Sequence, residues 1–415
     1  MQQSQPSALT TLSSYILDAL WSLSQALNCF PSNPSLKLNG TPYKILRLLG
    51  EGGFSYVYLV QPANSPTLYA LKKIRCPFGA ESVALAMREV EAYALFEGME
   101  GVIARVGWEV KDEGGEGGKT VYVLLPYYRR GNLQDAINAN LVNGSRFPER
   151  RLMGLFLGVC KALRGMHKYR VRGGEGRKKA DAAHEERRKH ARRRNGAGED
   201  DEGNEPLMEG EVMASQDGME EGQIRAYAHR DIKPGNIMIS DDGRQPILMD
   251  LGSLQPSPTP ITSRAMALQV QDQAAEHSTM PYRAPELFDV QLGSSIDTRV
   301  DVWSLGCTLY ACLVGKSPFE ARSEETGGSL SLCVLGGDWK FPDEGPAEAK
   351  RGKQKLSDAE DSQKRDDGIS EPVREIVRRC LTVEPAERPD IEALIRMVED
   401  CIAALPEDGD ADSED

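Results

Sequence analysis

Apolar residues recur along the chain at two spacings, which predict strands in some segments and helices in others. Short apolar runs bounded by turn residues indicate strands, and we place these at 43–61 (two strands joined by a turn), 69–74, 121–125, 237–239 and 246–250. Apolar positions three and four residues apart indicate helices, and we place these at 82–97, 149–168, 371–381 and 391–405. Further helices are expected to begin near Leu133 and Asp301.

Residues 1–40 precede the first strand of this series and carry a helical pattern of their own. Apolar residues recur there at Leu12, Ile16, Leu20, Leu23 and Leu27, and Asp18 is the only charge between Thr11 and Phe30. An amphipathic helix is therefore expected, with three placements open: packed on the main domain, on a membrane, or loose. Membrane binding by this helix alone would be weak because it lacks a basic face, and Cys29 is a candidate acylation site.

Two internal segments and the tail break the pattern. Residues 170–223 change from a basic half to an acidic half with few apolar residues, and 343–368 and 406–415 are also highly charged. Such segments bury too little apolar surface to offset their ordering entropy, so we expect disordered insertions and a disordered acidic tail. The basic run at 187–194 has two interpretations, a solvated tract or a localisation or docking signal.

Composition narrows the class of protein. The 415 residues are 40% hydrophobic, enough for a sizeable core, and the net charge of −13 argues against a general nucleic-acid binder. The 8 cysteines are scattered without a C-x-x-C pair, so we expect reduced structural thiols in the cytosol and no zinc site. No apolar run is long enough to span a membrane, and the N-terminus lacks the basic start of a secretory signal.

Candidate chemistry concentrates in the stretch from His229 to Asn236. Asp231 can accept a proton from a hydroxyl, Lys233 can neutralise a phosphoryl group, and Asn236 can help to hold a divalent cation. Asp250 stands at the end of an apolar strand, where a carboxylate can hold a cation that also binds phosphate oxygens.

A glycine-rich turn runs from Gly50 to Val57, where missing side chains let backbone N–H groups approach phosphates closely. Strand alternation then puts Ala70 and Lys72 on one face of the next strand. In the helix that follows, Glu89 is the expected ion-pair partner of Lys72, and Glu91 is the alternative.

These motifs together resemble protein kinases over residues 43–405. Within that superfamily the chain is similar to the Numb-associated kinase family, and especially to its myristoylated-and-palmitoylated subgroup and the yeast vacuolar-membrane relative. The stretches that carry the likeness are 49–57, with Ser55 in place of the third glycine, 248–253, with Leu251 in place of phenylalanine, and 282–288. The resemblance implies an α+β bilobal fold, with an antiparallel-sheet lobe at 41–127 bearing one main helix and a larger helical lobe at 128–405.

The resemblance also implies roles for single residues. Asp231 would be the base, Lys233, Lys72 and Glu89 would complete the catalytic set, and Asn236 and Asp250 would be the metal ligands. Residues expected to contact ATP are Leu49, Gly50, Glu51, Gly52, Gly53, Phe54, Ser55, Val57, Ala70, Lys72, Leu125, Pro126 and Tyr128. Supporting roles are expected for Thr279 beside Asp231 and Lys233, for Glu286 paired with Arg388, and for Asp301 bracing the catalytic-loop backbone. An extra helix is expected in the activation segment, 253–283.

The function implied is transfer of the γ-phosphoryl of ATP to protein serine and threonine hydroxyls, with Mg²⁺ (Mn²⁺ as an alternative) and with autophosphorylation. Peripheral association with Golgi, vacuolar or other endomembranes is implied as well. One departure is Gln2 in place of glycine, which excludes N-myristoylation at this start site. The alternative hypothesis is a catalytically weak scaffold of the same fold that binds partners through its charged insertions.

Overall fold

The computed structural model describes residues 35–112, 118–171, 222–344 and 368–407. The chain divides into two compact units, one formed by 1–83 with 106–127 and the other by 84–105 with 128–415. The amphipathic helix predicted within residues 1–40, Cys29, and most of the two charged insertions and the tail lie outside the described residues. No helix in the described part of the chain is long and apolar enough to cross a membrane.

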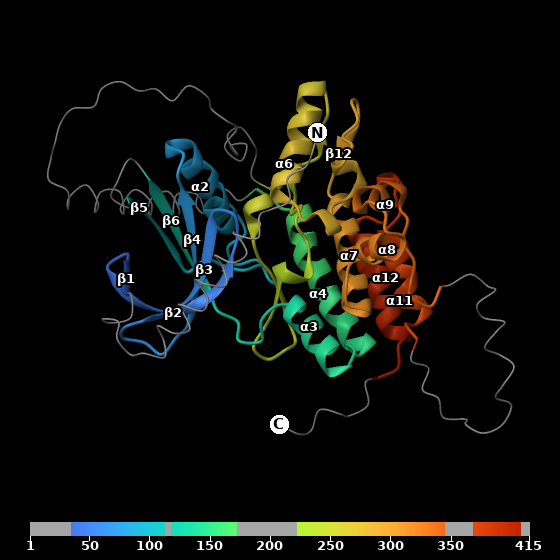
Figure 1. The fold of residues 1–415 in the computed structure, drawn as a ribbon, viewed down its shortest axis with the longest axis horizontal. Helices are drawn as coiled ribbons and strands as arrows, with labels where there is room; N and C mark the ends of the chain where they lie inside the picture. Colours follow the sequence, from blue (N-terminus) through green and yellow to red (C-terminus); the bar gives the residue numbers. More distant parts are fainter. Residues whose placement is uncertain (1–34, 113–117, 172–221, 345–367, 408–415) are drawn as a thin grey trace, which may run out of the picture. The chain divides into compact units, whose positions relative to one another are not determined.

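The first unit contains a six-stranded antiparallel sheet in the order β1-β2-β3-β4-β6-β5 (Figure 1). Its strands are β1 (Ser35–Leu38), β2 (Thr41–Glu51), β3 (Ser55–Pro62), β4 (Tyr69–Cys76), β5 (Gly107–Asp112) and β6 (Lys119–Pro126). One face is covered by a buried cluster of Leu38, Val60, Leu71, Tyr122 and Leu124.

Strand β1 corrects the prediction that residues 1–40 precede the first strand. It pairs with β2 through a turn at Asn39 and Gly40, whose φ angles are 46° and 85°. Asn-Gly with both φ angles positive is the usual sequence of a tight hairpin, so a sequence signal was present there. Strand β5 was also not predicted.

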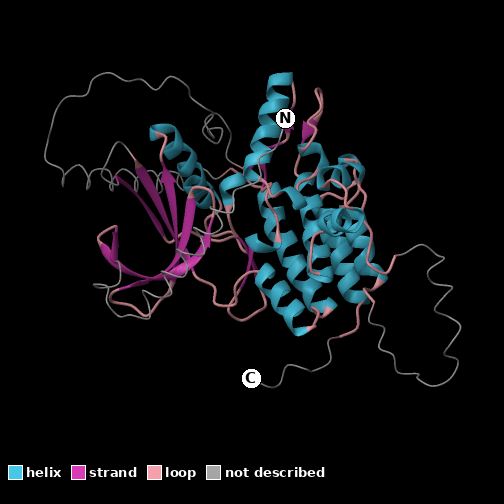
Figure 2. Ribbon diagram, in the orientation of Figure 1, coloured by secondary structure: helices cyan, strands magenta, loops and turns pink. Residues whose placement is uncertain are grey.

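Helices, which are cyan in Figure 2, dominate the second unit. They are α2 (Gly79–Leu95), which begins in the first unit, α3 (Leu133–Asn143), α4 (Glu149–His167), α6 (Arg264–His277), α7 (Arg299–Val314), α8 (Pro318–Thr326), α9 (Leu330–Gly336), α11 (Glu371–Cys380) and α12 (Ile391–Ala404). Helix α12 packs on α4, and α11 packs on α7. Short two-stranded sheets pair β7 (Ala226–Ala228) with β10 (Gln255–Ser257), β8 (Ile237–Ile239) with β9 (Pro246–Leu248), and β11 (Thr259–Pro260) with β12 (Ser295–Ile296).

Local sequence explains where helix α3 begins and ends. Asn132 caps α3 by accepting from the Asp135 backbone N–H, Asp135 accepts from the Asn132 N–H in return, and Gly144 ends the helix at a φ of 62°. Helix α7 is buried along most of its length, and Trp303 stacks on Phe319 with ring centroids 5.3 Å apart. A rigid α7 matters because it carries Asp301.

Residues on either side of the first insertion are paired. The Val171 N–H donates to the Gln223 carbonyl at 2.9 Å, and the Gly222 N–H donates to the Val171 carbonyl at 2.9 Å. The predicted insertion therefore starts and ends on ordered backbone next to α4 and β7.

Candidate active site

The loop between β7 and β8 brings together three of the predicted catalytic and metal-binding side chains. Asp231 is only 8% exposed, and its Oδ2 accepts hydrogen bonds from Lys233 Nζ and from Asn236 Nδ2, both at 2.9 Å. Its Oδ1 accepts from the backbone N–H of Thr279 at 2.9 Å and from the Thr279 hydroxyl at 2.7 Å. The Thr279 Oγ1 also accepts from Lys233 Nζ at 2.6 Å, which confirms the predicted supporting role of Thr279.

Asp301 of α7 holds the backbone of this loop by hydrogen bonds, as predicted. It is fully buried, and its carboxylate accepts the backbone N–H groups of His229 and Arg230, both at 2.8 Å. His167 Nε2 lies 2.9 Å from the same carboxylate. Burial alone would raise the pKa of Asp301, but the hydrogen bond and charge of His167, with smaller contributions from His229 and the Arg230 backbone, lower the pKa below its usual value.

Asp250 lies two residues after β9 in a left-handed conformation, with φ 62° and ψ 76°. A non-glycine residue in this region is uncommon and is held by its surroundings. The preceding Met249 donates its N–H to the Asn236 carbonyl at 2.9 Å, which ties the segment of Asp250 to the segment of Asn236. The Ser253 hydroxyl then donates to the His229 carbonyl at 2.7 Å. His167 was not predicted, and Ser253 was named as part of the stretch 248–253 that carries the resemblance, without this hydrogen bond.

In the first unit, strand register places four predicted ATP contacts on one face of the sheet. Val57 pairs with Lys72, and Ala70 pairs with Leu125, with Lys72 two residues after Ala70 on β4. Directly opposed residues share a face and alternate residues along a strand share a face, so all four side chains point the same way. Lys73 faces the other side, with its Nζ 5.8 Å from the Tyr122 ring centre.

The glycine-rich turn joins β2 to β3. Gly52 donates its N–H to the Ser55 carbonyl at 2.8 Å, and Phe54 is 56% exposed with its ring 6.0 Å from that of Phe78. The other predicted contacts, Leu49, Gly50, Glu51 and Gly53, lie at the end of β2 and in the turn itself, and Pro126 ends β6. Tyr128 belongs to the second unit, as does Glu89.

The activation segment contains the additional helix that the resemblance implied, α6, which begins at a Ser263 cap. Arg230 contacts this segment through its Nη2, which donates to the Thr259 hydroxyl at 3.3 Å. Burial lowers the pKa of Arg230 to about 10, and the nearby Asp301 charge opposes this change. Glu286 accepts from Arg388 Nη1 at 2.7 Å and from Nη2 at 2.9 Å, which confirms the predicted ion pair.

The donor chemistry at this site fits a hard divalent cation. Asn236 and Asp250 offer a carboxamide oxygen and a carboxylate, which are ligand types that Mg²⁺ accepts beside phosphate oxygens and water. Groups of three or more His, Cys, Asp or Glu side chains arranged to hold a metal do not occur in the described ranges.

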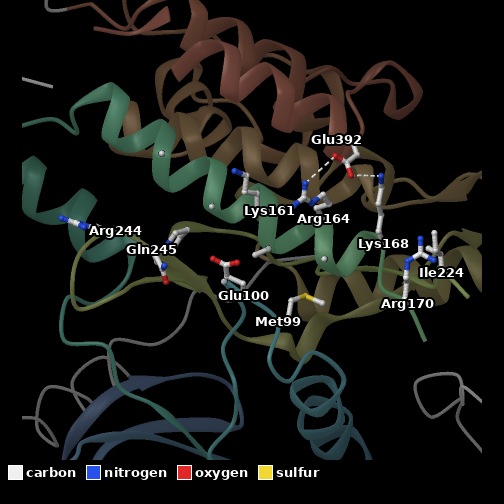
Figure 3. Close-up of a pocket in the computed structure, with 16 residues that line it drawn as sticks. Met99, Glu100, Lys161, Arg164, Lys168, Arg170, Ile224, Arg244, Gln245 and Glu392 are labelled. Carbon is white, nitrogen blue, oxygen red and sulfur yellow. Dashed lines mark hydrogen bonds and ion pairs between the residues drawn. The ribbon is translucent and has the colours of Figure 1, made fainter. Parts of the chain in front are cut away.

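A separate pocket of about 550 Å³ lies in the second unit and is lined by α4, the β8–β9 turn and Met99 (Figure 3). None of the predicted site residues lines it. Several of its cations already have carboxylate partners, since Lys168 and Arg164 lie 2.8 and 3.9 Å from Glu392. Lys161 is 3.3 Å from Glu399.

Comparisons with known proteins show to which family the chain belongs. Residues 223–398 match the family model described as "Protein kinase domain". The chain is 33% identical to serine/threonine-protein kinase ENV7 of Saccharomyces cerevisiae over 386 residues, 89% of this chain and 94% of the relative. It is 33% identical to serine/threonine-protein kinase ppk13 of Schizosaccharomyces pombe, over 96% of this chain and 98% of the relative. It is 29% identical to serine/threonine-protein kinase 16 of Rattus norvegicus, over 89% and 94%. The chain therefore belongs to the protein kinase family and stands among the serine/threonine-protein kinases.

Proposed function

We propose that this chain transfers the γ-phosphoryl group of ATP to serine and threonine hydroxyls of proteins, itself included. The observation that carries the proposal is the Asp231 carboxylate, which is buried and fixed by Lys233, Asn236 and Thr279. A carboxylate held in one orientation can position an incoming hydroxyl and accept its proton. Lys233, which shares a hydrogen bond with it, can neutralise charge on the transferred group.

The remaining residues then divide into nucleotide contacts and cation ligands. The glycine-rich turn and Lys72 would hold the phosphates, Glu89 would orient Lys72, and Val57, Ala70, Leu125, Pro126 and Tyr128 would surround the adenine. Asn236 and Asp250 would hold Mg²⁺. When bound, that ion supplies neutralising charge to the phosphate oxygens. Little covalent chemistry falls to the protein in such a reaction, so positioning and charge account for most of the rate.

The direct test is labelling of generic acceptor proteins with radioactive ATP, comparing the wild type with Asp250→Ala. We expect magnesium-dependent label on serine and threonine that disappears in the variant. Asp242→Ala is the matched control, because Asp242 is an exposed carboxylate in the β8–β9 turn, and it should label normally. Equal labelling by the wild type and Asp250→Ala would remove Asp250 from its role, and label on tyrosine alone would contradict the acceptor class.

Lys72 offers a second test with a neighbouring control. Lys72→Ala should lose most activity, whereas Lys73→Ala should retain it because Lys73 lies on the opposite sheet face against Tyr122. Equal losses in the two variants would indicate damage to β4 rather than removal of a phosphate ligand.

We also propose membership of the Numb-associated kinase family and peripheral attachment to endomembranes. The activation-segment helix α6 and Leu251 after Asp250 support the family placement. Flotation of the full chain with vesicles, with and without residues 1–34, tests the attachment. Recovery of both forms only in the soluble fraction would contradict it.

A further inference from the structure

Phe78, in the short link between β4 and α2, is an exposed aromatic residue to which the proposed chemistry assigns no role. It is 72% exposed, so burial in the core does not explain its ring. The ring centre lies 6.0 Å from that of Phe54, at an interplanar angle of 76°. Aromatic rings prefer such edge-to-face contacts, with centres about 4.5–7 Å apart. Because Phe54 belongs to the glycine-rich turn, the contact joins the link to the segment expected to hold the ATP phosphates.

The backbone makes a second connection between the same two segments. The Arg75 N–H donates to the Phe54 carbonyl at 2.8 Å. This bond lies one residue beyond Ser55 and Ile74, which form the terminal pair in the register of β3 and β4. The main chain at the tip of the turn is therefore fixed to the end of β4. The Phe54 side chain remains 56% exposed and contacts Phe78.

The link has a backbone that holds Phe78 in one place. The Phe78 N–H donates to the Ser82 hydroxyl at 3.0 Å, and that hydroxyl donates to the Gly79 carbonyl at 3.2 Å. Gly79 has a φ of 68°, a left-handed conformation that favours glycine. Pro77 precedes the aromatic residue, and its ring fixes its own φ. The backbone on both sides of Phe78 is thus restrained, which keeps the exposed ring next to Phe54.

From this geometry we infer that Phe78 is a positioning residue for ATP binding, whose ring restrains the tip of the glycine-rich turn through Phe54. All of the residues involved belong to the first unit. The inference rests on the proposed function, since the turn matters only if its backbone N–H groups hold the ATP phosphates. A turn that is restrained before ATP binds loses less conformational entropy on binding. Loss of the ring contact should therefore weaken binding of the phosphates and leave binding of the adenine unchanged.

The test compares Phe78→Leu with the wild type in equilibrium binding of ATP with Mg²⁺ and of adenosine, both measured by calorimetry. Leucine keeps an apolar side chain but removes the aromatic ring. We expect the Kd of ATP to rise about fivefold, which corresponds to about 1 kcal/mol, and the Kd of adenosine to stay the same. Steady-state assays should show a comparable rise in KM for ATP with little change in kcat. Phe78→Tyr keeps the ring and should bind ATP as the wild type does.

Val106→Ala is the matched control for loss of an exposed apolar side chain. Val106 is 51% exposed and lies in the first unit next to β5, at one edge of the sheet, whereas the turn joins β2 and β3. This variant should bind both ligands normally, and all variants should melt at the wild-type temperature because both positions are exposed. Unchanged ATP affinity in Phe78→Leu, or equal losses of affinity for ATP and adenosine, would overturn the inference while leaving the kinase activity established.

A double variant tests whether the contact between the two rings carries the effect. Adding Phe78→Leu to Phe54→Leu should raise the Kd of ATP less than Phe78→Leu does in the wild type, because both changes remove one contact. Fully multiplicative rises in Kd would show that Phe78 acts without Phe54 and would overturn the inference. A wild type that neither binds ATP nor transfers phosphate would overturn the proposed function and this inference with it.

Discussion

The catalytic loop, 229–236, and the glycine-rich turn, 50–57, both contain residues with proposed roles in catalysis, but the loop is largely buried and the turn is largely exposed. His229, Arg230, Asp231 and Asn236 are all 8% exposed or less, and hydrogen bonds from several other elements hold them. The turn from Gly50 to Ser55 lies largely in solvent and is held by local bonds, such as the one from the Gly52 N–H to the Ser55 carbonyl. The residues proposed to act on a proton are thus fixed in advance, whereas those proposed to contact the nucleotide phosphates lie in an exposed turn.

The largest effect expected from this contrast follows removal of the Asp231 charge. Asp231→Asn keeps the size of the side chain but loses the proton acceptor, so kcat should fall by about 10³-fold, within the usual range for a general base. Steady-state phosphorylation of a protein acceptor measures this, with Asp242→Asn as an active control. A variant that retains a tenth of the wild-type kcat would show that Asp231 is not the base.

Asp301 tests whether the rigidity of the catalytic loop depends on its brace. Asp301→Asn leaves buried donors poorly matched, and breaking a buried charged interaction costs about 3–5 kcal/mol of unfolding free energy. Urea unfolding measures the loss. Asp338→Asn, which breaks an exposed ion pair with Arg322, should change little. A loss as small as that of the control would mean that the loop holds its shape without Asp301.

The pH dependence of stability gives the same residue a second test. The folded pKa of Asp301 is lowered, so its contribution is present above the unfolded pKa of about 3.9 and is lost as pH falls through the folded value. Wild-type stability should therefore drop below about pH 4, and Asp301→Asn should show a shallower drop there. Parallel acid curves for the two proteins would contradict this assignment.

The residues of the catalytic loop and those that support it differ in how far the sequence alone could predict them. Asp231, Lys233 and Asn236 fall within one short stretch, so their chemistry is visible in local spacing. Asp301 and the Glu286–Arg388 pair are separated from their partners by long sequence distances, and only resemblance to a family indicated them. His167 has neither signal, because a histidine at the end of an amphipathic helix is indistinguishable from an ordinary core residue.

The secondary structure could likewise be predicted only where a local sequence pattern is clear. Helix α4 was predicted almost to the residue because its apolar stripe is continuous. Strand β5 carries a short alternating pattern, in which Trp108 and Val110 alternate with charged residues, and it was missed because only two apolar residues define that pattern. It is stabilised by pairing with β6, which a local pattern cannot reveal.

A smaller effect is expected at Thr279, which connects the activation segment to the catalytic loop. Thr279→Val removes the hydroxyl that donates to Asp231 and accepts from Lys233, so kcat should fall about 10-fold. Thr279→Ser keeps the hydroxyl and should retain most activity. Full activity of Thr279→Val would mean that the site does not require these hydrogen bonds, and comparable losses in both variants would mean that it requires the methyl group as well as the hydroxyl.

The smallest effect, in the exposed turn, distinguishes two reasons for its glycines. A Cβ on Gly52 would lie 3.1 Å from Ser55 Oγ, whereas one on Gly53 has no atom within 4 Å. If turn geometry is what matters, Gly52→Ala should raise KM for ATP about threefold and Gly53→Ala should not, since a contact of this kind costs well under 1 kcal/mol when the serine can rotate. Neither change should alter the melting temperature, because the turn is exposed. An equal rise in KM for both variants would show instead that ATP approaches the backbone closely at both Gly52 and Gly53. The turn would then have a fixed shape for binding, as the catalytic loop does.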